Sequence, residues 1–281
     1  MTNILGTFCK RFFGQNEVLH RSYDNCLYIS ESEKNDLRQK YIKWIHRRFL
    51  YIKFSLITDT EMNYNRTRVI ISHWVPFMCD QINISPSEQL LHTWSDTQKS
   101  VNIQLLDLNH FQFHRNPVAG STDAIRGKIG FSTGIHIWKI TWPESMRGTH
   151  AVIGVATDKA VLQHNSYVSL IGFDKESWGW DIVSRKKVHD KMSGNPICSQ
   201  IYPDSNKIHA KRYFGKHESI PETIYVILDM FQGTLSYMIS DIFLGIAHSN
   251  LKGKTLYPSV SAVWGHCEVS ISYMNNVSSS F

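Results

Sequence analysis

The chain of 281 residues has no run of about 18 apolar residues, so no segment has the length and hydropathy of a transmembrane helix. Its first residues also lack the uninterrupted apolar stretch of a signal peptide. The five cysteines are scattered and form no C-x-x-C pair, which argues against a zinc or redox site. These absences predict a soluble, cytoplasmic protein with reduced thiols.

Nucleotide-binding and metal-binding patterns are also missing. Gly127-Lys128 lacks both the earlier glycine and the following Ser or Thr of a phosphate-binding loop. The 14 histidines include no H-E-x-x-H pair of the zinc-protease type. We therefore expect a binding protein rather than an enzyme, with no catalytic residues, no metal and no cofactor. Asp123, Arg126 and Lys128 are close enough in sequence to predict a local ion-pair network.

Positive charge is concentrated near the amino terminus. Residues 1–75 hold 12 Lys and Arg against 7 Asp and Glu, whereas the rest of the chain holds 18 against 17. The sequence therefore predicts a basic extension over 1–75, a near-neutral domain over 76–274 and a short tail over 275–281. A basic isoelectric point can indicate nucleic-acid binding. Because the surplus belongs to the extension, we expect no nucleic-acid partner.

Residues 31–54 are predicted to form an amphipathic helix within this extension. Ser30 and Glu33 have the spacing of a capping box, and apolar residues recur at helical spacing from Leu37 to Ile52. The opposite face is basic, which would suit an anionic membrane surface or an acidic partner. The favoured alternative is that the apolar face packs on the neighbouring domain or that the segment is a poorly ordered tail.

The pattern changes to β-strands from Gln89 onward. Apolar and polar residues alternate, with turn residues between the runs, and the turn near Gln232-Gly233 predicts a hairpin. Cys267 falls on the apolar face of the last run and is expected in the core. The clearest alternating segments are 138–142, 223–230, 234–240 and 267–274. They predict an all-β fold, an antiparallel sandwich of two sheets in which each strand turns one face inward and one to water.

Four short segments carry glycine, proline or aromatic residues at the predicted junctions between strands and loops. They are residues 115–128 (RNPVAGSTDAIRGK), 147–157 (RGTHAVIGVAT), 176–182 (ESWGWDI) and 256–266 (LYPSVSAVWGH). At such junctions a rigid sheet can present aromatic and polar groups as a recognition surface. Trp178 and Trp180 are the exception, since we expect them to be core aromatics.

In this order, the four segments resemble the SPRY (B30.2) domain and, within it, the SPRY domain-containing SOCS box proteins. The resemblance runs from about Gln89 to Tyr273. It implies a bent β-sandwich whose edge loops bind an extended peptide of the form Asp/Glu-Ile/Leu-Asn-Asn-Asn. It also implies the role of a substrate-recognition subunit in an elongin BC and cullin-RING E3 ubiquitin ligase, which marks bound targets for ubiquitination and proteasomal degradation.

The resemblance also implies which residues bind the peptide. Carried over by motif, they are Arg115, Pro117, Ala119, Thr149, Tyr167, Val263, Trp264 and Gly265. A pocket that reads asparagine amides needs backbone N–H and C=O groups, which Gly265 and its neighbours could present to a closely approaching ligand. Arg115 would offer a rigid fork to a carbonyl or an acidic group. Tyr167 and Trp264 would offer flat aromatic walls, although either could instead be a core aromatic.

Two departures from the family pattern affect these expectations. The family commonly has Gln after the alanine of the first segment, where this chain has Gly120, so affinity or motif preference can differ. In the family a SOCS box follows the sandwich, whereas the sequence after the last predicted strand is short and polar up to Phe281. Elongin B, elongin C and a cullin are therefore expected as partners only of a fuller product that carries the box.

Three interpretations remain open from the sequence. The chain is part of a ligase substrate receptor, or a box-less form that binds the same peptides as a competitor or scaffold. The third is an adaptor attached to a membrane through residues 31–54. Recovery of elongin B and C in a pull-down separates the first two, and liposome sedimentation with residues 1–75 deleted tests the third.

Overall fold

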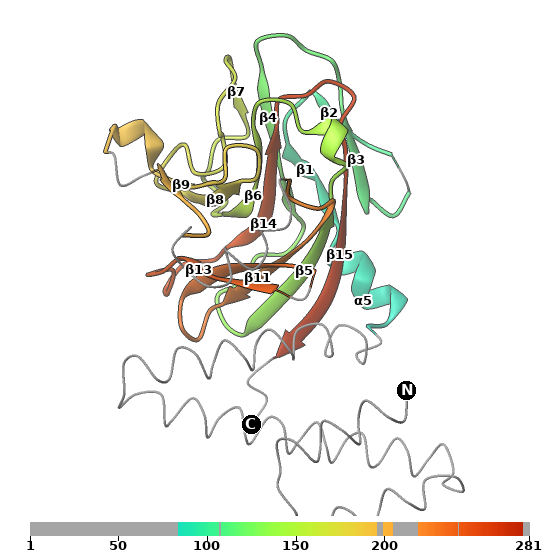
Figure 1. The fold of residues 1–281 in the computed structure, drawn as a ribbon. Coiled ribbons are helices and arrows are strands. Elements are labelled where there is room, and N and C mark those ends of the chain that lie inside the picture. The colour runs from blue at the N-terminus through green and yellow to red at the C-terminus, as the bar shows by residue number, and fades with distance from the viewer. Residues whose placement is uncertain (1–83, 107, 196–198, 205–218, 241, 278–281) are drawn as a thin grey trace, which may run out of the picture. The chain divides into compact units, whose positions relative to one another are not determined.

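The computed structural model describes residues 84–106, 108–195, 199–204, 219–240 and 242–277, with the side chains of 275–277 excepted. The predicted helix over 31–54 and the predicted boundary at residue 75 lie outside these ranges. Within them, no helix has the length and hydropathy needed to cross a membrane. Two sheets of antiparallel strands make up most of the regular structure (Figure 1).

The first sheet has the strand order β1-β4-β14-β6-β8-β9-β10, and β7 pairs with β4. Its strands are β1 (Trp94–Lys99), β4 (Thr122–Gly127), β6 (Ala151–Ala156), β7 (Gln163–His164), β8 (Ser177–Asp181), β9 (Lys186–His189), β10 (Ser199–Ile201) and β14 (Tyr257–Ala262). The second sheet has the order β13-β12-β11-β5-β15-β3-β2. Its strands are β2 (Ile103–Leu105), β3 (Gln112–Arg115), β5 (Ile135–Thr141), β11 (Thr223–Asp229), β12 (Thr234–Ile239), β13 (Ile242–His248) and β15 (Glu268–Val277).

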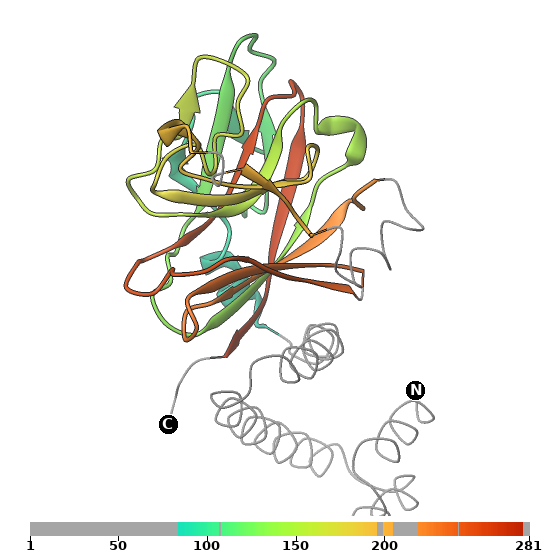
Figure 2. The same cartoon turned by 60° about the vertical axis from the view of Figure 1, so that its left-hand side comes forward.

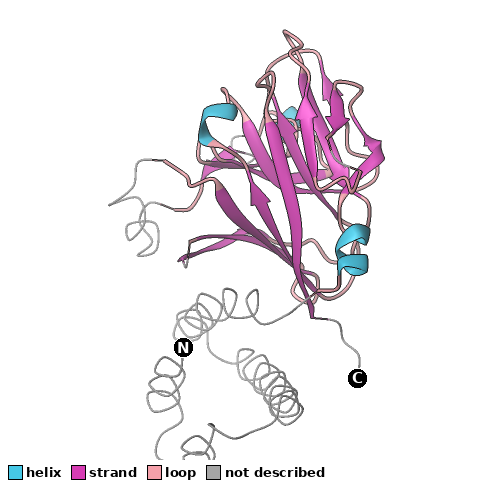
Figure 3. Ribbon diagram, turned by 90° about the vertical axis from the view of Figure 1, so that its right-hand side faces the viewer, coloured by secondary structure: helices cyan, strands magenta, loops and turns pink. Residues whose placement is uncertain are grey.

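The described helices are short and lie at the margins of the sheets (Figure 3). They are α5 (Pro86–Leu91) and the 3-10 turns η2 (Glu144–Met146) and η3 (Lys191–Ser193). The two sheets face each other as layers (Figure 2). The predicted all-β antiparallel sandwich is therefore confirmed. The last strand continues to Val277, three residues into the segment predicted as a tail.

The predicted hairpin is formed by β11 and β12. The two strands pair from Ile224 with Ile239 to Asp229 with Thr234, and Gly233 closes the turn with a φ of +71°. Such a left-handed conformation favours glycine because a Cβ atom would be strained there. Gly233, from which the hairpin was predicted, is thus the residue that closes its turn.

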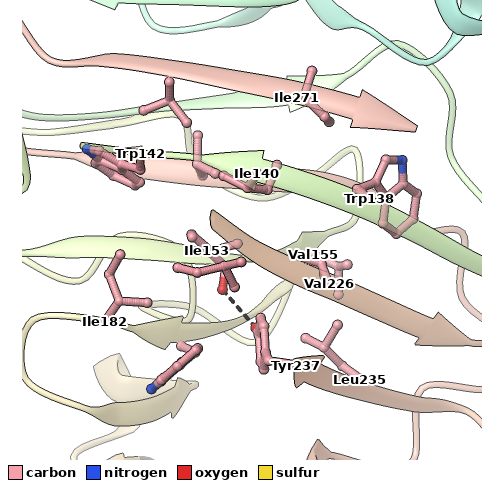
Figure 4. Packing of buried hydrophobic residues seen from close by; sticks show 14 of the residues in the cluster. Trp138, Ile140, Trp142, Ile153, Val155, Ile182, Val226, Leu235, Tyr237 and Ile271 are labelled. Atoms are coloured by element: carbon pink, nitrogen blue, oxygen red, sulfur yellow. Dashed lines mark hydrogen bonds between the residues drawn. The ribbon is translucent and has the colours of Figure 1, made fainter. Parts of the chain in front are cut away.

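The core lies between the two sheets (Figure 4). Trp138, Ile140 and Trp142 share one face of the chain through β5 and are at most 1% exposed. The Tyr237 hydroxyl reaches across from the second sheet and donates a hydrogen bond of 2.7 Å to the Ile153 carbonyl on β6. Large aromatic side chains thus fill the space between the layers, and the buried Tyr237 hydroxyl has a partner, as burial of a polar group requires.

The expectation of one inward face and one wet face is wrong for the centre of the first sheet. Every residue of β4, β6 and β8 is buried. A second apolar cluster explains this, because Leu170 and Ile171 of the segment between β6 and β8 pack on Val152 and Ala156. The segment covers the outer face of the sheet, so both faces of these strands are buried, including polar residues such as Asp123 and Arg126 on β4.

Candidate functional site

Strand pairing brings three loops of the motif segments to one end of the sandwich. β3 pairs with β15 through His114 and Glu268, so the loop after β3 lies beside the loop before β15. β14 pairs with β6 through Ala262 and Ala151, which places the loop after β14 beside the loop before β6. The loops are residues 116–121, 142–150 and 263–267. Figure 1 shows β7, η2 and the loop between β14 and β15 at this upper end.

Arg115 is fully buried and binds the loop that follows it. Its Nε donates to Asp123 Oδ2 at 2.7 Å. Its Nη1 donates to the Asn116 carbonyl at 3.2 Å, and its Nη2 donates to the carbonyls of Val118 and Ser121 at 3.0 and 2.8 Å. All three guanidinium nitrogens are thus engaged within the chain. The geometry favours a role in shaping the loop over the predicted role as a fork presented to a peptide.

The buried carboxylate of Asp123 is the centre of this polar network. It also accepts hydrogen bonds from Asn102 Nδ2 at 2.9 Å and from the Ser121 hydroxyl at 3.1 and 3.2 Å. The Asn116 N–H in turn donates to the Asn102 carbonyl at 2.8 Å. The network holds the turn between β1 and β2 against the loop after β3, so this part of the surface is fixed by a buried ion pair.

The predicted network of Asp123, Arg126 and Lys128 is wrong. Asp123 and Arg126 are three residues apart on β4, and alternation along a strand puts their side chains on opposite faces. Arg126 instead donates to Gln98 Oε1 and to backbone carbonyls, including that of Thr157 at 2.9 Å. Lys128 is exposed.

Gly265 and Pro117 lie in close contact where two of the loops meet. A Cβ atom on Gly265 would stand 2.8 Å from both Cα and Cβ of Pro117, closer than side chains are found to pack. Glycine is therefore needed here for the approach of the loop after β3. From the sequence we expected a glycine here so that a ligand could approach closely. The structure gives a different reason, the contact with Pro117.

Trp264 lies against Gly148, which the sequence analysis did not select. A Cβ atom on Gly148 would meet Trp264 Cβ and Val263 Cγ2 at 3.2 Å, and its φ of +64° also favours glycine. Thr149 follows directly and is exposed. The signal for Gly148 was present, since it belongs to the same R-G-T-H segment that identified Thr149.

Tyr167 is joined to the first loop by a hydrogen bond. Its hydroxyl accepts from the Gly120 N–H at 2.9 Å. The neighbouring Val168 N–H donates to Thr122 Oγ1 at 3.0 Å, and that hydroxyl donates to the Ser166 carbonyl at 2.6 Å. These bonds attach the segment around Tyr167 to the start of β4, so its ring is held beside the loop that carries Ala119.

The eight predicted residues are therefore gathered at one end but are not equally accessible. Tyr167 and Trp264 are 51% and 50% exposed, so neither is a core aromatic, whereas Trp178 and Trp180 are buried as expected. Pro117, Ala119 and Thr149 are exposed, while Arg115 and Val263 are buried. The accessible surface consists of two aromatic rings with small residues between them.

A second buried carboxylate, that of Asp181 at the end of β8, holds the segments next to this surface in place. Its Oδ2 accepts from the Ser169 hydroxyl at 2.8 Å and from His150 Nδ1 at 2.9 Å, and its Oδ1 accepts the backbone N–H groups of Val183 and Ser184. Burial alone would raise the pKa of Asp181, but hydrogen bonds from His150 and Ser169 hold that pKa below its usual range. The carboxylate ties together the segments that follow Thr149 and Tyr167.

The serine, histidine and aspartate of this cluster do not form a nucleophilic triad. The Ser169 hydroxyl and Asp181 both face the same nitrogen, His150 Nδ1, at 3.3 and 2.9 Å. In a triad the histidine bridges the two through its two different nitrogens. The cluster is arranged to hold backbone segments in place.

Residues 130–134 read G-F-S-T-G, a G-x-S-x-G pattern that the sequence analysis overlooked. In hydrolases this pattern places the serine on a sharp turn between a strand and a helix. Here the segment lies between two strands, β4 and β5, with Ser132 exposed. Its surroundings therefore differ from those of a nucleophile elbow.

A cavity of about 300 Å³ borders the surface at Gly148. The residues that line it are Glu144, Arg147, Gly148, Ile182, Val183, Arg185, Ser219 and Ile220. It contains none of the eight predicted residues. The Arg147 guanidinium is buried and donates to the carbonyls of Trp142, Ile220 and Pro221 at 2.7 to 2.9 Å, so it supports the wall of this cavity.

Comparisons with known proteins agree with this architecture. The model of the SPRY domain family matches residues 135–275. The chain is 43% identical over 202 residues to "SPRY domain-containing SOCS box protein 1" of Homo sapiens, covering 71% of this chain and 70% of that protein. It is 42% identical over 204 residues to "Protein gustavus" of Drosophila melanogaster, with 72% and 70% covered. It is 46% identical over 185 residues to "F-box/SPRY domain-containing protein 1" of Drosophila virilis, with 66% and 68% covered.

The β-sandwich with its loop surface is thus that of a SPRY domain. The chain belongs to the SPRY domain-containing SOCS box protein family, as the sequence predicted. Members of this class are protein-interaction modules. The resemblance stated from the four motif segments is confirmed at the level of the family.

Proposed function

We propose that this chain recognises target proteins for a ubiquitin ligase of the elongin and cullin type. It would do so by binding an extended Asp/Glu-Ile/Leu-Asn-Asn-Asn segment at the loop surface formed around Pro117, Thr149, Tyr167 and Trp264. Family membership supports the broader role, a protein-interaction module of the ubiquitin-ligase adaptor type. The relatives named for a SOCS box and for an F-box share the sandwich with this chain, which suits a sandwich that carries recognition.

The observation that carries the proposal is the exposure of two aromatic rings on a fixed frame. Tyr167 and Trp264 are about half exposed, although both contact loops held by buried polar groups. Aromatic side chains on a rigid support contribute much of the binding energy in protein interfaces because little entropy is lost on binding. A preformed surface of this kind suits an extended peptide.

Recognition of asparagine would depend on the backbone of the same loops. An asparagine side chain needs both donors and acceptors, and the exposed residues from Pro117 to Gly120 would supply mainly carbonyl acceptors and the Ala119 N–H, since the Val118 and Gly120 N–H groups already donate to the Asn116 carbonyl and to Tyr167. The Gly120 N–H already donates to the Tyr167 hydroxyl. A bound peptide would therefore share this N–H or displace the hydroxyl from it. Because Arg115 is engaged inside the loop, an acidic residue at the start of the motif would be read by backbone N–H groups.

Calorimetric titration of the chain with an Asp-Ile-Asn-Asn-Asn peptide tests the proposal. We expect a Kd of about 1 µM or tighter, equivalent to roughly −8 kcal/mol. A peptide with one asparagine replaced by alanine should bind more weakly by about 1 to 3 kcal/mol, because a buried partner is left unsatisfied. In Trp264→Ala the loss should be about 2 kcal/mol or more.

The matched control for Trp264→Ala is Ile246→Ala on β13. Ile246 is 45% exposed and belongs to a strand at the far edge of the second sheet, so its truncation should leave peptide affinity unchanged. Tyr167→Phe removes only the hydroxyl that accepts from Gly120. It therefore separates the contribution of this hydrogen bond to peptide affinity from that of the ring. Equal affinity for the parent and alanine-substituted peptides, in a folded wild type, would contradict the proposed motif.

Gly120 allows the family difference to be tested directly. Its φ is +67°, and no atom lies within 4 Å of an added Cβ, so Gly120→Gln meets conformational strain but no clash. If the missing side chain explains a change of motif preference, Gly120→Gln should bind the family peptide more tightly than the parent chain does. Unchanged affinity would show that this position does not select the motif.

Ligase recruitment is a separate step with its own measurement. A pull-down with elongin B and elongin C measures recruitment. It compares the chain itself with a version extended by a family SOCS box. We expect the extended version to recover both elongins and to keep the same peptide affinity. Loss of peptide affinity in the extended version would contradict independent recognition and recruitment.

A further inference from the structure

Two histidines at the edge of the loop surface face each other without a role in the proposed function. His114 is the third residue of β3, and His266 directly follows Gly265. His266 Nδ1 lies 3.4 Å from His114 Nε2. The His266 N–H donates to the Arg115 carbonyl at 2.8 Å, so the backbone that carries this histidine is tied to β3.

A carboxylate lies on the other side of the His114 ring. Glu268 pairs with His114 across β15 and β3, and its Oε1 lies 3.6 Å from His114 Nδ1. Its Oε2 accepts from Gln112 Nε2 at 2.9 Å, which fixes the carboxylate. A carboxylate beside one ring nitrogen favours the proton there, and this tautomer would leave the lone pair of His114 on Nε2, toward His266.

We propose that His114 Nε2 and His266 Nδ1 form a chelating site for Zn²⁺. Zinc binds imidazole nitrogen at about 2.0 to 2.1 Å with tetrahedral angles, which separates two nitrogen ligands by roughly 3.3 to 3.4 Å. The observed separation of 3.4 Å matches this spacing. The arrangement of Glu268, His114 and the metal position is the carboxylate–histidine–zinc order found around metal ligands.

The site is open, with two ligands from the protein. Within the described ranges, no group of three or more His, Cys, Asp or Glu is arranged to hold a metal ion. The remaining coordination positions therefore belong to water or to a group on a bound partner. His266 is exposed and the His114 side chain is 20% exposed, so solvent reaches the pair.

The backbone at His266 supports a functional role for this residue. Its φ is +63°, in the left-handed region that residues other than glycine rarely adopt. Strained backbone conformations cluster at binding and catalytic sites. His266 is one of six described residues other than glycine with a positive φ, and the one that lies beside His114.

Calorimetric titration of the full chain with ZnCl₂ at pH 7.5, after removal of metal with a chelator, tests the site. The wild type should bind one equivalent of zinc that His266→Asn and His114→Gln each bind at least 10-fold more weakly or lose. Asparagine is chosen at residue 266 because it tolerates a positive φ. Glu268→Gln should weaken the same equivalent by about 10-fold, since it removes the charge beside His114.

The control is His164→Ala, which removes a partly exposed histidine on β7 whose Nδ1 is 2.8 Å from the Ser166 hydroxyl. It should bind zinc as the wild type does. Circular dichroism of each variant verifies that the fold is kept. Equal stoichiometry and affinity in wild type, His266→Asn and His114→Gln would overturn the proposal and leave a shared proton as the reason for the 3.4 Å approach.

Discussion

The two ends of the sandwich carry similar aromatic residues in opposite states. At the loop end, Tyr167 and Trp264 are 51% and 50% exposed. At the other end, aromatic and histidine rings stack on one another and are largely buried; they are His92, Phe131, His136, Trp138 and Tyr273. The difference teaches that aromatic content alone does not separate an exposed surface from a core. What differs is the kind of group that supports the rings.

At the loop end the rings are supported by charged groups, and at the other end they are supported by each other. The Arg115 and Asp123 pair holds the first loop in place, and Asp181 holds the segments after Thr149 and Tyr167. At the buried end burial lowers the pKa of His92 and His136 to about 4, so both rings are neutral near pH 7. A neutral imidazole can pack as a flat ring, as His92 does on Tyr273 at 3.7 Å between centroids.

Breaking the ion pair at the loop end should have the largest effect. Arg115→Ala or Asp123→Ala leaves a buried charge without its partner, which should cost about 3 to 5 kcal/mol in the free energy of unfolding. Urea denaturation followed by tryptophan fluorescence measures this cost. The double variant should cost less than the sum of the two, because each single change already removes the same interaction. Single variants within about 0.5 kcal/mol of wild type would show that the loop needs no such support.

Acid should weaken the buried end, and it should also act on His248 of β13, whose pKa burial likewise lowers to about 4. His92 and His136 titrate at about 4 when folded and near 6.5 when unfolded, so below pH 6.5 the unfolded chain binds more protons. Stability is therefore complete above pH 6.5 and falls as the pH drops toward 4, by on the order of 2 to 3 kcal/mol for each histidine. Denaturation midpoints at pH 7.5, 5.5 and 4.5 measure the slope.

The matched variant for this test is His92→Phe. It keeps a flat ring against Tyr273 and removes the titrating group, and no hydrogen bond of His92 Nδ1 is lost. We expect a smaller loss of stability between pH 6.5 and 4 than in the wild type. An unchanged pH slope in His92→Phe would assign the acid sensitivity to other groups.

A methyl group at the junction of two loops should have a smaller effect. Gly265→Ala places Cβ 2.8 Å from Pro117, so one of the loops must move. Overpacking of this kind costs about 1 to 3 kcal/mol. Thermal unfolding measures the cost, and peptide titration should show weaker binding if the displaced loop carries recognition residues as proposed. Wild-type values in both measurements would show that the loops adjust freely.

The smallest effect on stability is expected at the exposed ring itself. Trp264→Ala should change the free energy of unfolding by no more than about 0.5 kcal/mol, since half of the side chain is already in water. Trp138→Ala, its counterpart in the buried cluster, should cost about 3 to 5 kcal/mol. Chemical denaturation of the two variants side by side tests the comparison. Similar losses in both would mean that Trp264 is part of the core.

Periodicity was sufficient to predict the sandwich and its inward faces. The alternation in β11 and β12, the turn at Gly233 and the buried Cys267 all follow from a period of two and a glycine at the turn. Burial raises the pKa of the Cys267 thiol to about 12, in keeping with an unreactive core residue. The covered outer face of the first sheet was not predictable, because it depends on where the segment between β6 and β8 folds.

For the candidate site, the sequence indicated which residues to consider but not the contacts that each one makes. Motif positions identified Tyr167 and Trp264 correctly as aromatics outside the core. They could not show that Arg115 turns inward, because its partner Asp123 belongs to the next strand and is selected only by three-dimensional packing. The same holds for Gly265, whose requirement comes from Pro117, about 150 residues earlier in the chain.

The wide spacing of these contacts has a consequence for synthesis in the cell. The first loop of the surface follows β3, yet β3 is held in the sheet by β15, and β4 by β14. A nascent chain that has emerged from the ribosome only as far as β13 therefore contains five of the eight proposed peptide-binding residues, but it lacks Val263, Trp264 and Gly265 and the two strands that pair with β3 and β4. On the proposed function, we expect target binding to begin only after β15 has left the exit tunnel, so that an unfinished copy does not compete for targets with a finished one.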